Sequence, residues 1–145
     1  MTKGTYISTE LSGIGNRYIL NLLEKSGIEN YLESGKFHMT IIYAPNDKLP
    51  YGKESKTFMA TVTGYDVLGE GKWQGLVLKL SCPDAEKFHQ DILDEYGNVH
   101  SYPEFNCHMT VKYRPDKGDL DKLKKMIRVG ARISFTGINS APLEP

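Results

Sequence analysis

Apolar and polar residues alternate with a period of two in several short stretches of the chain, a spacing typical of half-buried strands. Between them, apolar residues recur at helical spacing, as with Ile14, Tyr18 and Leu22. The pattern predicts an α+β protein with the order β-α-β-β followed by β-α-β-α-β. The predicted strands cover residues 5–10, 37–45, 57–68, 72–81, 107–115 and 131–139, and the predicted helices cover residues 13–32, 83–96 and 119–129.

One segment of the chain occurs twice. Residues 37–45, FHMTIIYAP, return as residues 107–115, CHMTVKYRP, with His, Met, Thr, Tyr and Pro in register. Each copy is rich in β-branched and aromatic residues and ends at a proline, so both copies are predicted to be strands. The repeat indicates one domain, residues 1–145, with halves at about residues 1–70 and 71–145. Mixed sheets with helices on one face are expected, forming two lobes around a cleft.

The side chains of a strand alternate between its two faces, which sorts the residues of both copies. In the first copy His38 and Thr40 share a face, and in the second copy His108, Thr110 and Lys112 do. The apolar residues between them are expected to pack against the helices. These five side chains are therefore predicted to lie together on the uncovered side of the sheet, and Tyr43 and Tyr113 are predicted to pack in the core.

The neighbouring strands add candidates by the same alternation. In residues 72–81 the leucines at alternate positions are expected to be buried, which turns Trp73, Val77 and Lys79 toward the cleft. Trp73 is either a stacking platform for a nucleobase or a partly buried packing residue. If Ile7 is buried, Tyr6 faces the cleft together with Ser8.

The paired motifs suit the cleavage of a phosphodiester. The reaction removes a proton from an attacking hydroxyl or water and gives one to the departing oxygen, and histidine does both near neutral pH. His38 and His108 are the candidate acid and base. Thr40 and Thr110 can donate hydrogen bonds to a phosphate oxygen, and Lys112 is either a cation for that phosphate or an ordinary strand lysine. This chemistry needs no metal or other cofactor, and the sequence offers no carboxylate cluster for magnesium.

With one H-x-T motif on a strand in each half, the chain resembles the two-histidine phosphoesterase superfamily. The resemblance implies a bilobal fold with a pseudo-twofold axis through the cleft, His38 and His108 as the acid–base pair, and Thr40 and Thr110 as phosphate ligands. Within the superfamily the HMT motifs and the opening GTYISTEL are most similar to the phage anti-CBASS nucleases. That similarity implies hydrolysis of 3′,5′ bonds in cyclic di- and trinucleotide immune messengers such as 3′3′-cGAMP, with Tyr6 as a nucleotide contact. The carboxy-terminal NSAPLEP offers Glu144 but no aromatic residue for a lid.

Other functions fit parts of the pattern. An enzyme of the same chemistry can open 2′,3′-cyclic phosphates at RNA ends, but the chain has 18 basic and 18 acidic residues and no broad basic face for long nucleic acid. A non-catalytic binding protein that sequesters cyclic nucleotides would not need a paired acid and base. A metal site built on the histidines is the remaining alternative.

The rest of the sequence gives weaker expectations. No apolar stretch is long enough to span a membrane and no signal peptide precedes the first strand, so a cytoplasmic protein is expected, in the host cytosol if phage-encoded. A monomer is also expected. Cys82 and Cys107 are expected to be free thiols without a role. His89 and His100 are expected at the solvated surface, although the loop that holds His100 can border the cleft. Residues 117–125 are expected to form a solvated helix surface.

Overall fold

The computed structural model of the chain describes residues 4–102 and 104–143, so Glu144 lies outside it. The predicted order of elements is confirmed. The strands are β1 (Thr5–Leu11), β2 (His38–Ala44), β3 (Gly52–Leu68), β4 (Gly75–Ser81), β5 (His108–Tyr113) and β6 (Arg132–Pro142); the helices are α1 (Gly13–Ser26), α2 (Pro83–Tyr96) and α3 (Asp119–Met126), and Gly71–Trp73 form a short 3-10 helix.

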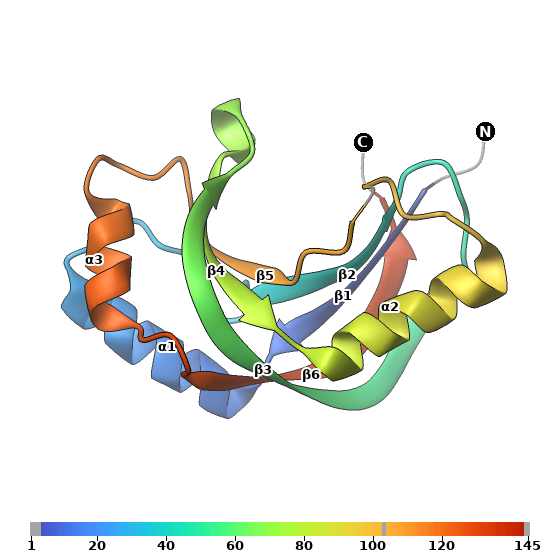
Figure 1. Cartoon of the computed structure of the whole chain (residues 1–145), viewed down its shortest axis with the longest axis horizontal. Helices are drawn as coiled ribbons and strands as arrows, with labels where there is room; N and C mark the ends of the chain where they lie inside the picture. Colours follow the sequence, from blue (N-terminus) through green and yellow to red (C-terminus); the bar gives the residue numbers. More distant parts are fainter. Residues whose placement is uncertain (1–3, 103, 144–145) are drawn as a thin grey trace.

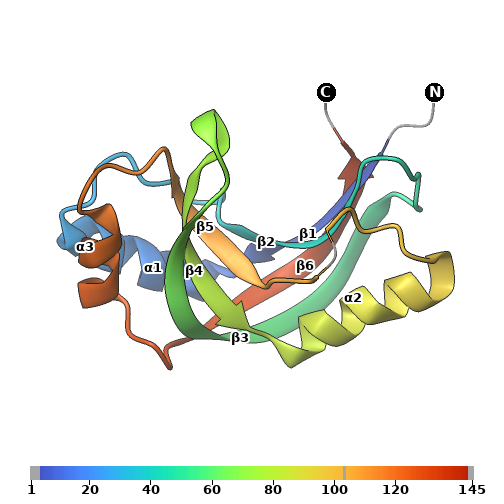
Figure 2. The same ribbon diagram turned by 45° about the horizontal axis from the view of Figure 1, so that its top comes forward.

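The six strands form one closed sheet in the order β1-β2-β5-β4-β3-β6. All neighbouring strands are antiparallel, so the expectation of mixed sheets is wrong. The loop at residues 27–37 turns the chain after α1, and β2 therefore runs against β1 rather than parallel to it. Figures 1 and 2 show α1 and α3 at one end of the molecule and α2 at the opposite end, with β2 and β5 between them.

The core consists of apolar side chains from alternate strand positions together with one face of each long helix. Leu76, Leu78 and Leu80 of β4 are buried, as predicted, and so are Met39 and Met109 of the two motif strands. Each large apolar side chain that leaves water contributes roughly 1.5–3 kcal/mol. A slip of one residue would expose this whole set, so core packing fixes which side chains point the other way.

The first helix is shorter than predicted. Ser12 accepts a hydrogen bond from the Gly15 amide and caps its start, and Gly27, with φ 85°, ends it in the left-handed conformation that glycine adopts easily. Residues 27–32 are therefore not helical, contrary to expectation. The buried face of α1 includes Ile19, whereas Ile14 is 79% exposed, so the apolar spacing indicated the helix but not its inward face.

An extra residue in β2 changes the alternation of side chains. The register of β2 against β1 jumps between Thr40 and Ile42, so that Ile41 has no partner. Such a β-bulge places two successive residues on one side of the sheet. Ile41 and Ile42 are both fully buried, and Tyr43 returns to the face of Thr40, where it is half-buried.

The second motif strand has the same irregularity at the corresponding place. The register of β5 against β4 jumps between Thr110 and Lys112, which leaves Val111 without a partner. Lys112 is 2% exposed and Tyr113 is half-buried on the opposite face. The expectation that Lys112 shares the face of His108 is wrong, and so is the expectation that Tyr43 and Tyr113 pack in the core, because each bulge reverses the alternation after the threonine.

Candidate functional site

One residue pair joins the two motif strands. Met39 of β2 pairs with Met109 of β5, and both methionines are fully buried, so the residues on either side of each point to the other surface. Counting one residue along each antiparallel strand places each motif histidine opposite the threonine of the other motif. The histidines are then diagonal neighbours, with their Cα atoms roughly 7–8 Å apart. We call this group the histidine face: His38, Thr40, His108 and Thr110.

The two imidazoles are held in the same way. His38 donates its Nδ1–H to the carbonyl oxygen of Lys36 at 3.0 Å, and His108 donates its Nδ1–H to the carbonyl oxygen of Asn106 at 2.9 Å. In both motifs the acceptor lies two residues before the histidine. Since a carbonyl can only accept, Nδ1 carries a proton and Nε2 is the nitrogen that exchanges one. Each ring can therefore act as a base when neutral and as an acid when protonated.

Tyr6 of β1 supports the first motif. Its hydroxyl lies 2.6 Å from the hydroxyl of Thr40, and its ring meets His38 edge to face with centroids 6.0 Å apart. Burial raises the pKa of the Tyr6 phenol, the bond to Thr40 lowers it, and the nearby Tyr113 phenol raises it further, with a net upward shift. Tyr6 therefore stays neutral and can orient the Thr40 hydroxyl.

The corresponding position beside the second motif has no side chain. Tyr6 is paired with Tyr43 in the register of β1 and β2, and Gly75 is paired with Tyr113 in the register of β4 and β5. A Cβ atom at Gly75 would lie 3.0 Å from Cγ2 of Thr110, closer than an ordinary contact. The two threonines are therefore equivalent in the strands but differ in their surroundings.

Aromatic rings lie at both ends of the histidine face. Tyr113 meets Trp73 edge to face at 5.9 Å between centroids, and Tyr43 meets Tyr102 at 5.7 Å. Trp73 is 67% exposed, and it lies in the 3-10 helix rather than in the predicted strand of residues 72–81. Alternation alone missed Tyr43 and Tyr113. Their recurrence in register in both copies was the available signal.

The sequence matches the family model described as Anti-CBASS protein Acb1 over residues 3–139, which includes both motif strands. The chain belongs to the anti-CBASS protein Acb1 family. The anti-CBASS protein Acb1 of Vibrio phage KVP40 is 30% identical over 114 residues, which cover 77% of this chain and 74% of the phage protein. The expected similarity to anti-CBASS proteins is confirmed.

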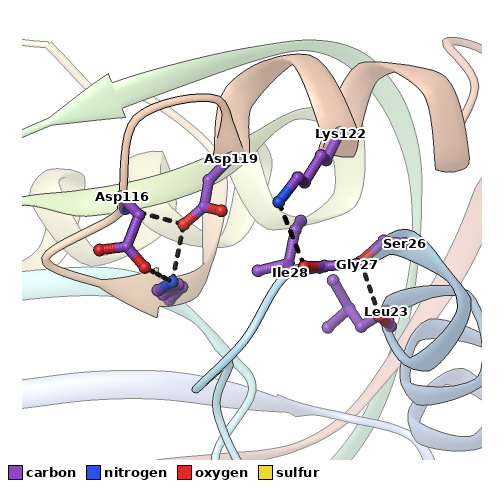
Figure 3. A network of polar contacts seen from close by, with 8 residues as sticks. Leu23, Ser26, Gly27, Ile28, Asp116, Asp119 and Lys122 are labelled. Carbon is purple, nitrogen blue, oxygen red and sulfur yellow. Dashed lines mark hydrogen bonds and ion pairs between the residues drawn. The ribbon is translucent and has the colours of Figure 1, made fainter.

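Lys112 of this Acb1 family member is engaged within the fold. Its ammonium donates to Asp119 at 2.7 Å and to Asp116 at 2.9 Å, and Figure 3 shows how these two carboxylates converge at the start of α3. Burial lowers the pKa of the Lys112 ammonium, but the two carboxylates more than offset this, and the net shift is upward. The structure brings Lys112 together with these acids and not with the histidine face.

The other two histidines also contact the first motif strand. His89 is 6% exposed, stacks on Phe105 with centroids 4.2 Å apart, and donates Nδ1–H to the Ile41 carbonyl at 2.7 Å. The expected surface position of His89 is therefore wrong. His100 is half-buried and accepts the Tyr43 amide N–H at Nδ1 at 3.1 Å. Burial, and secondarily His89, lower the pKa of His100 to about 4.

Cys82 and Cys107 are free and buried, which confirms the expectation of free thiols, and burial raises the pKa of Cys107 to about 12. Within residues 4–102 and 104–143, no three His, Cys, Asp or Glu side chains gather as metal ligands, and no helix there is long and apolar enough to cross a membrane. A hollow of about 420 Å³ between α2 and the following loop is lined by His89 and His100, among others, and not by the histidine face.

Proposed function

We propose that this Acb1 family protein is a metal-independent phosphodiesterase that hydrolyses 3′,5′ bonds in cyclic di- and trinucleotides such as 3′3′-cGAMP, and so counters CBASS defence. The observation that carries the proposal is the paired geometry of His38 and His108, each on one of two adjacent strands, with Nδ1 held by a backbone carbonyl. The family name supports the choice of an immune messenger as substrate.

The reaction follows from this arrangement. The Nε2 atom of the neutral imidazole takes the proton of the attacking hydroxyl, which is water or the 2′-hydroxyl next to the phosphate, and the new P–O bond forms. The P–O5′ bond breaks, and the protonated imidazole gives its Nε2–H to the departing oxygen. Each proton transfer by a positioned side chain contributes about 10²- to 10⁴-fold. Thr40 and Thr110 donate to the non-bridging oxygens, where negative charge increases.

The two halves of the chain are proposed to form the pseudo-twofold phosphoesterase fold. The third strand of each half pairs with the first strand of the other, as β3 with β4 and β6 with β1, and both motif strands carry a bulge after the threonine. A cyclic dinucleotide has two similar halves as well. Tyr43 with Tyr102, and Tyr113 with Trp73, supply a pair of rings for each base, and stacking contributes about 1–3 kcal/mol per base.

Two alternatives remain as outcomes of the test. An enzyme for 2′,3′-cyclic phosphates at RNA ends would use the same histidines, but the equal numbers of acidic and basic residues favour a small substrate. A protein that only sequesters nucleotides has no need of two imidazoles with matched Nδ1 bonds. Since one chain supplies both motifs, we propose that a monomer acts in the host cytosol.

The test incubates the purified protein in EDTA with 3′3′-cGAMP and, separately, with an oligoribonucleotide that ends in a 2′,3′-cyclic phosphate. The variants are His38→Ala, His108→Ala and, as a control on the far helix α1, Tyr18→Phe. Linearisation of the cyclic dinucleotide by the wild type and the control alone supports the proposal. Turnover of only the RNA end would reassign the enzyme to RNA processing. Tight binding of cGAMP without turnover would indicate sequestration.

A further inference from the structure

The two motif histidines have neighbours of opposite charge. Across β1 and β2, Glu10 is paired with His38, and across β4 and β5, Lys79 is paired with His108. Residues directly opposite each other on one face of an antiparallel pair have Cβ atoms about 4.5–5.5 Å apart. Glu10 and Lys79 are both exposed and occupy corresponding positions beside the two motifs. The strands around the histidines are alike, whereas the charges beside them differ in sign.

We propose that these charges decide the direction of proton transfer: His38, beside the Glu10 carboxylate, is the general acid, and His108, beside the Lys79 ammonium, is the general base. The inference rests on the proposed phosphodiesterase function and deepens it. Glu10 and Lys79 are positioning residues, because they act through the imidazoles and not on the substrate. A nearby carboxylate favours the protonated imidazole, and a nearby ammonium favours the neutral one.

The reaction starts from one protonated and one neutral imidazole, because one ring gives a proton and the other takes one. The charge beside each ring decides which of the two starts with the proton. The phosphate of the substrate attracts a proton on either ring and so does not distinguish the two.

The other groups around the rings leave this asymmetry in place. His38 faces Tyr6, which is neutral, and Glu10 on β1. His108 faces Lys79 on β4, and the carboxylate of Asp66 on β3 lies 3.7 Å from the Lys79 ammonium. Asp66 weakens the effect of Lys79 only in part, because both side chains are about half exposed and Asp66 also accepts the Val67 amide N–H at 2.8 Å. The two histidines are diagonal neighbours across β2 and β5.

In the resulting step His108 Nε2 takes the proton of the attacking hydroxyl while its oxygen bonds to phosphorus. The P–O5′ bond breaks, and the Nε2 proton of His38 passes to the departing O5′. Afterwards His108 is protonated and His38 is neutral, and water returns the pair to its starting state. When the attacking hydroxyl is that of water, one water molecule is consumed. When it is the 2′-hydroxyl, the product ends in a 2′,3′-cyclic phosphate and no other reactant is consumed.

The roles are assigned with a cyclic dinucleotide in which sulfur replaces both 5′-bridging oxygens, because a thiolate leaves without a proton. We expect His38→Ala to lose at least about 100-fold in kcat on the oxygen substrate and less than about 10-fold on the sulfur substrate. We expect His108→Ala to lose kcat by the same factor on the oxygen and the sulfur substrate. The assignment is overturned if the sulfur substrate restores kcat in His108→Ala instead of His38→Ala, in both variants, or in neither. If the wild type cleaves neither compound, the proposed function itself is wrong.

The part played by the two charges is tested by pH profiles of kcat/KM for Glu10→Gln and Lys79→Met, with Glu24→Gln and Lys87→Met as controls from exposed helix positions. Loss of the carboxylate moves the alkaline limb to lower pH, and loss of the ammonium moves the acid limb to higher pH. Both changes narrow the profile. If the acid and alkaline limbs of both variants lie within the range of the two control variants, Glu10 and Lys79 do not decide the roles of the histidines.

Discussion

The imidazole of His89 donates a hydrogen bond to the carbonyl oxygen of Ile41, the extra residue of the bulge in β2. The carbonyl of Val111, the extra residue in β5, accepts the amide N–H of Leu32 at 2.9 Å. Each bulge is therefore held from outside the six-stranded sheet, by α2 in one case and by the loop after α1 in the other. Since the bulges return a tyrosine to the histidine face, these bonds help to define the candidate site.

Removal of the Tyr6 hydroxyl is expected to lower activity without unfolding the protein. In Tyr6→Phe the Thr40 hydroxyl loses its partner at 2.6 Å and is no longer oriented toward the phosphate. A hydrogen bond of about 1 kcal/mol corresponds to roughly a fivefold fall in kcat/KM on 3′3′-cGAMP. Tyr18→Phe, at an exposed position of α1, is the control. Equal rates for the two variants would mean that Thr40 needs no support from Tyr6.

The two glycines of the neighbouring strands should respond differently to a methyl group. In Gly75→Ala the new Cβ lies 3.0 Å from Cγ2 of Thr110 and must displace it, whereas in Gly64→Ala the nearest atom is Cδ of Lys79, at an ordinary 3.6 Å. Small displacements of positioning groups are costly, and we expect kcat to fall about tenfold for Gly75→Ala and less than twofold for Gly64→Ala. Thermal melting of both variants checks that they are folded. A normal rate for folded Gly75→Ala would argue against a role for Thr110.

Lys112→Met is expected to destabilise the protein strongly, because it leaves the Asp119 carboxylate buried without its cation. Breaking a buried ion pair in this way costs about 3–5 kcal/mol in the free energy of unfolding, measured by urea denaturation. The double variant Lys112→Met/Asp119→Leu removes both charges and should recover most of the loss. If Lys112→Met instead keeps full stability but binds cGAMP poorly, Lys112 contacts the phosphate after all.

Acid should weaken the fold through His100. Its pKa in the folded protein is about 4, below the ordinary 6.5, so as the pH falls the unfolded chain takes up this proton first. The contribution of neutral His100 to stability is complete above pH 6.5 and is lost as the pH falls toward 4. His100→Asn keeps an acceptor for the Tyr43 amide but does not titrate. Between pH 7 and pH 5, its urea midpoint should fall less than that of the wild type, and equal falls would exclude His100 as the cause.

The limits of the sequence prediction can be traced to particular residues. The alternation of apolar and polar residues identified β2, β5 and the buried leucines of β4, because these strands are long enough for the alternation to show. It failed at Tyr43, Lys112 and Tyr113, since a bulge depends on the register with a neighbouring strand, which no local pattern contains. His89 was misplaced for a similar reason: its partner, the Ile41 carbonyl, lies 48 residues away in the sequence.

Closure of the sheet has a consequence for synthesis on the ribosome. β1 is hydrogen-bonded on one side to β2 and on the other to β6, with Thr5 paired to Pro142 at nearly opposite ends of the chain. One edge of the first strand therefore stays unpaired until the last strand has been made. Contacts of such wide sequence separation are slow to form, and exposed edges invite pairing with other chains. The nascent protein should thus be most prone to aggregation when β1 to β5 have been made and β6 has not, and a chain that ends before Arg132 has no strand with which to close the sheet.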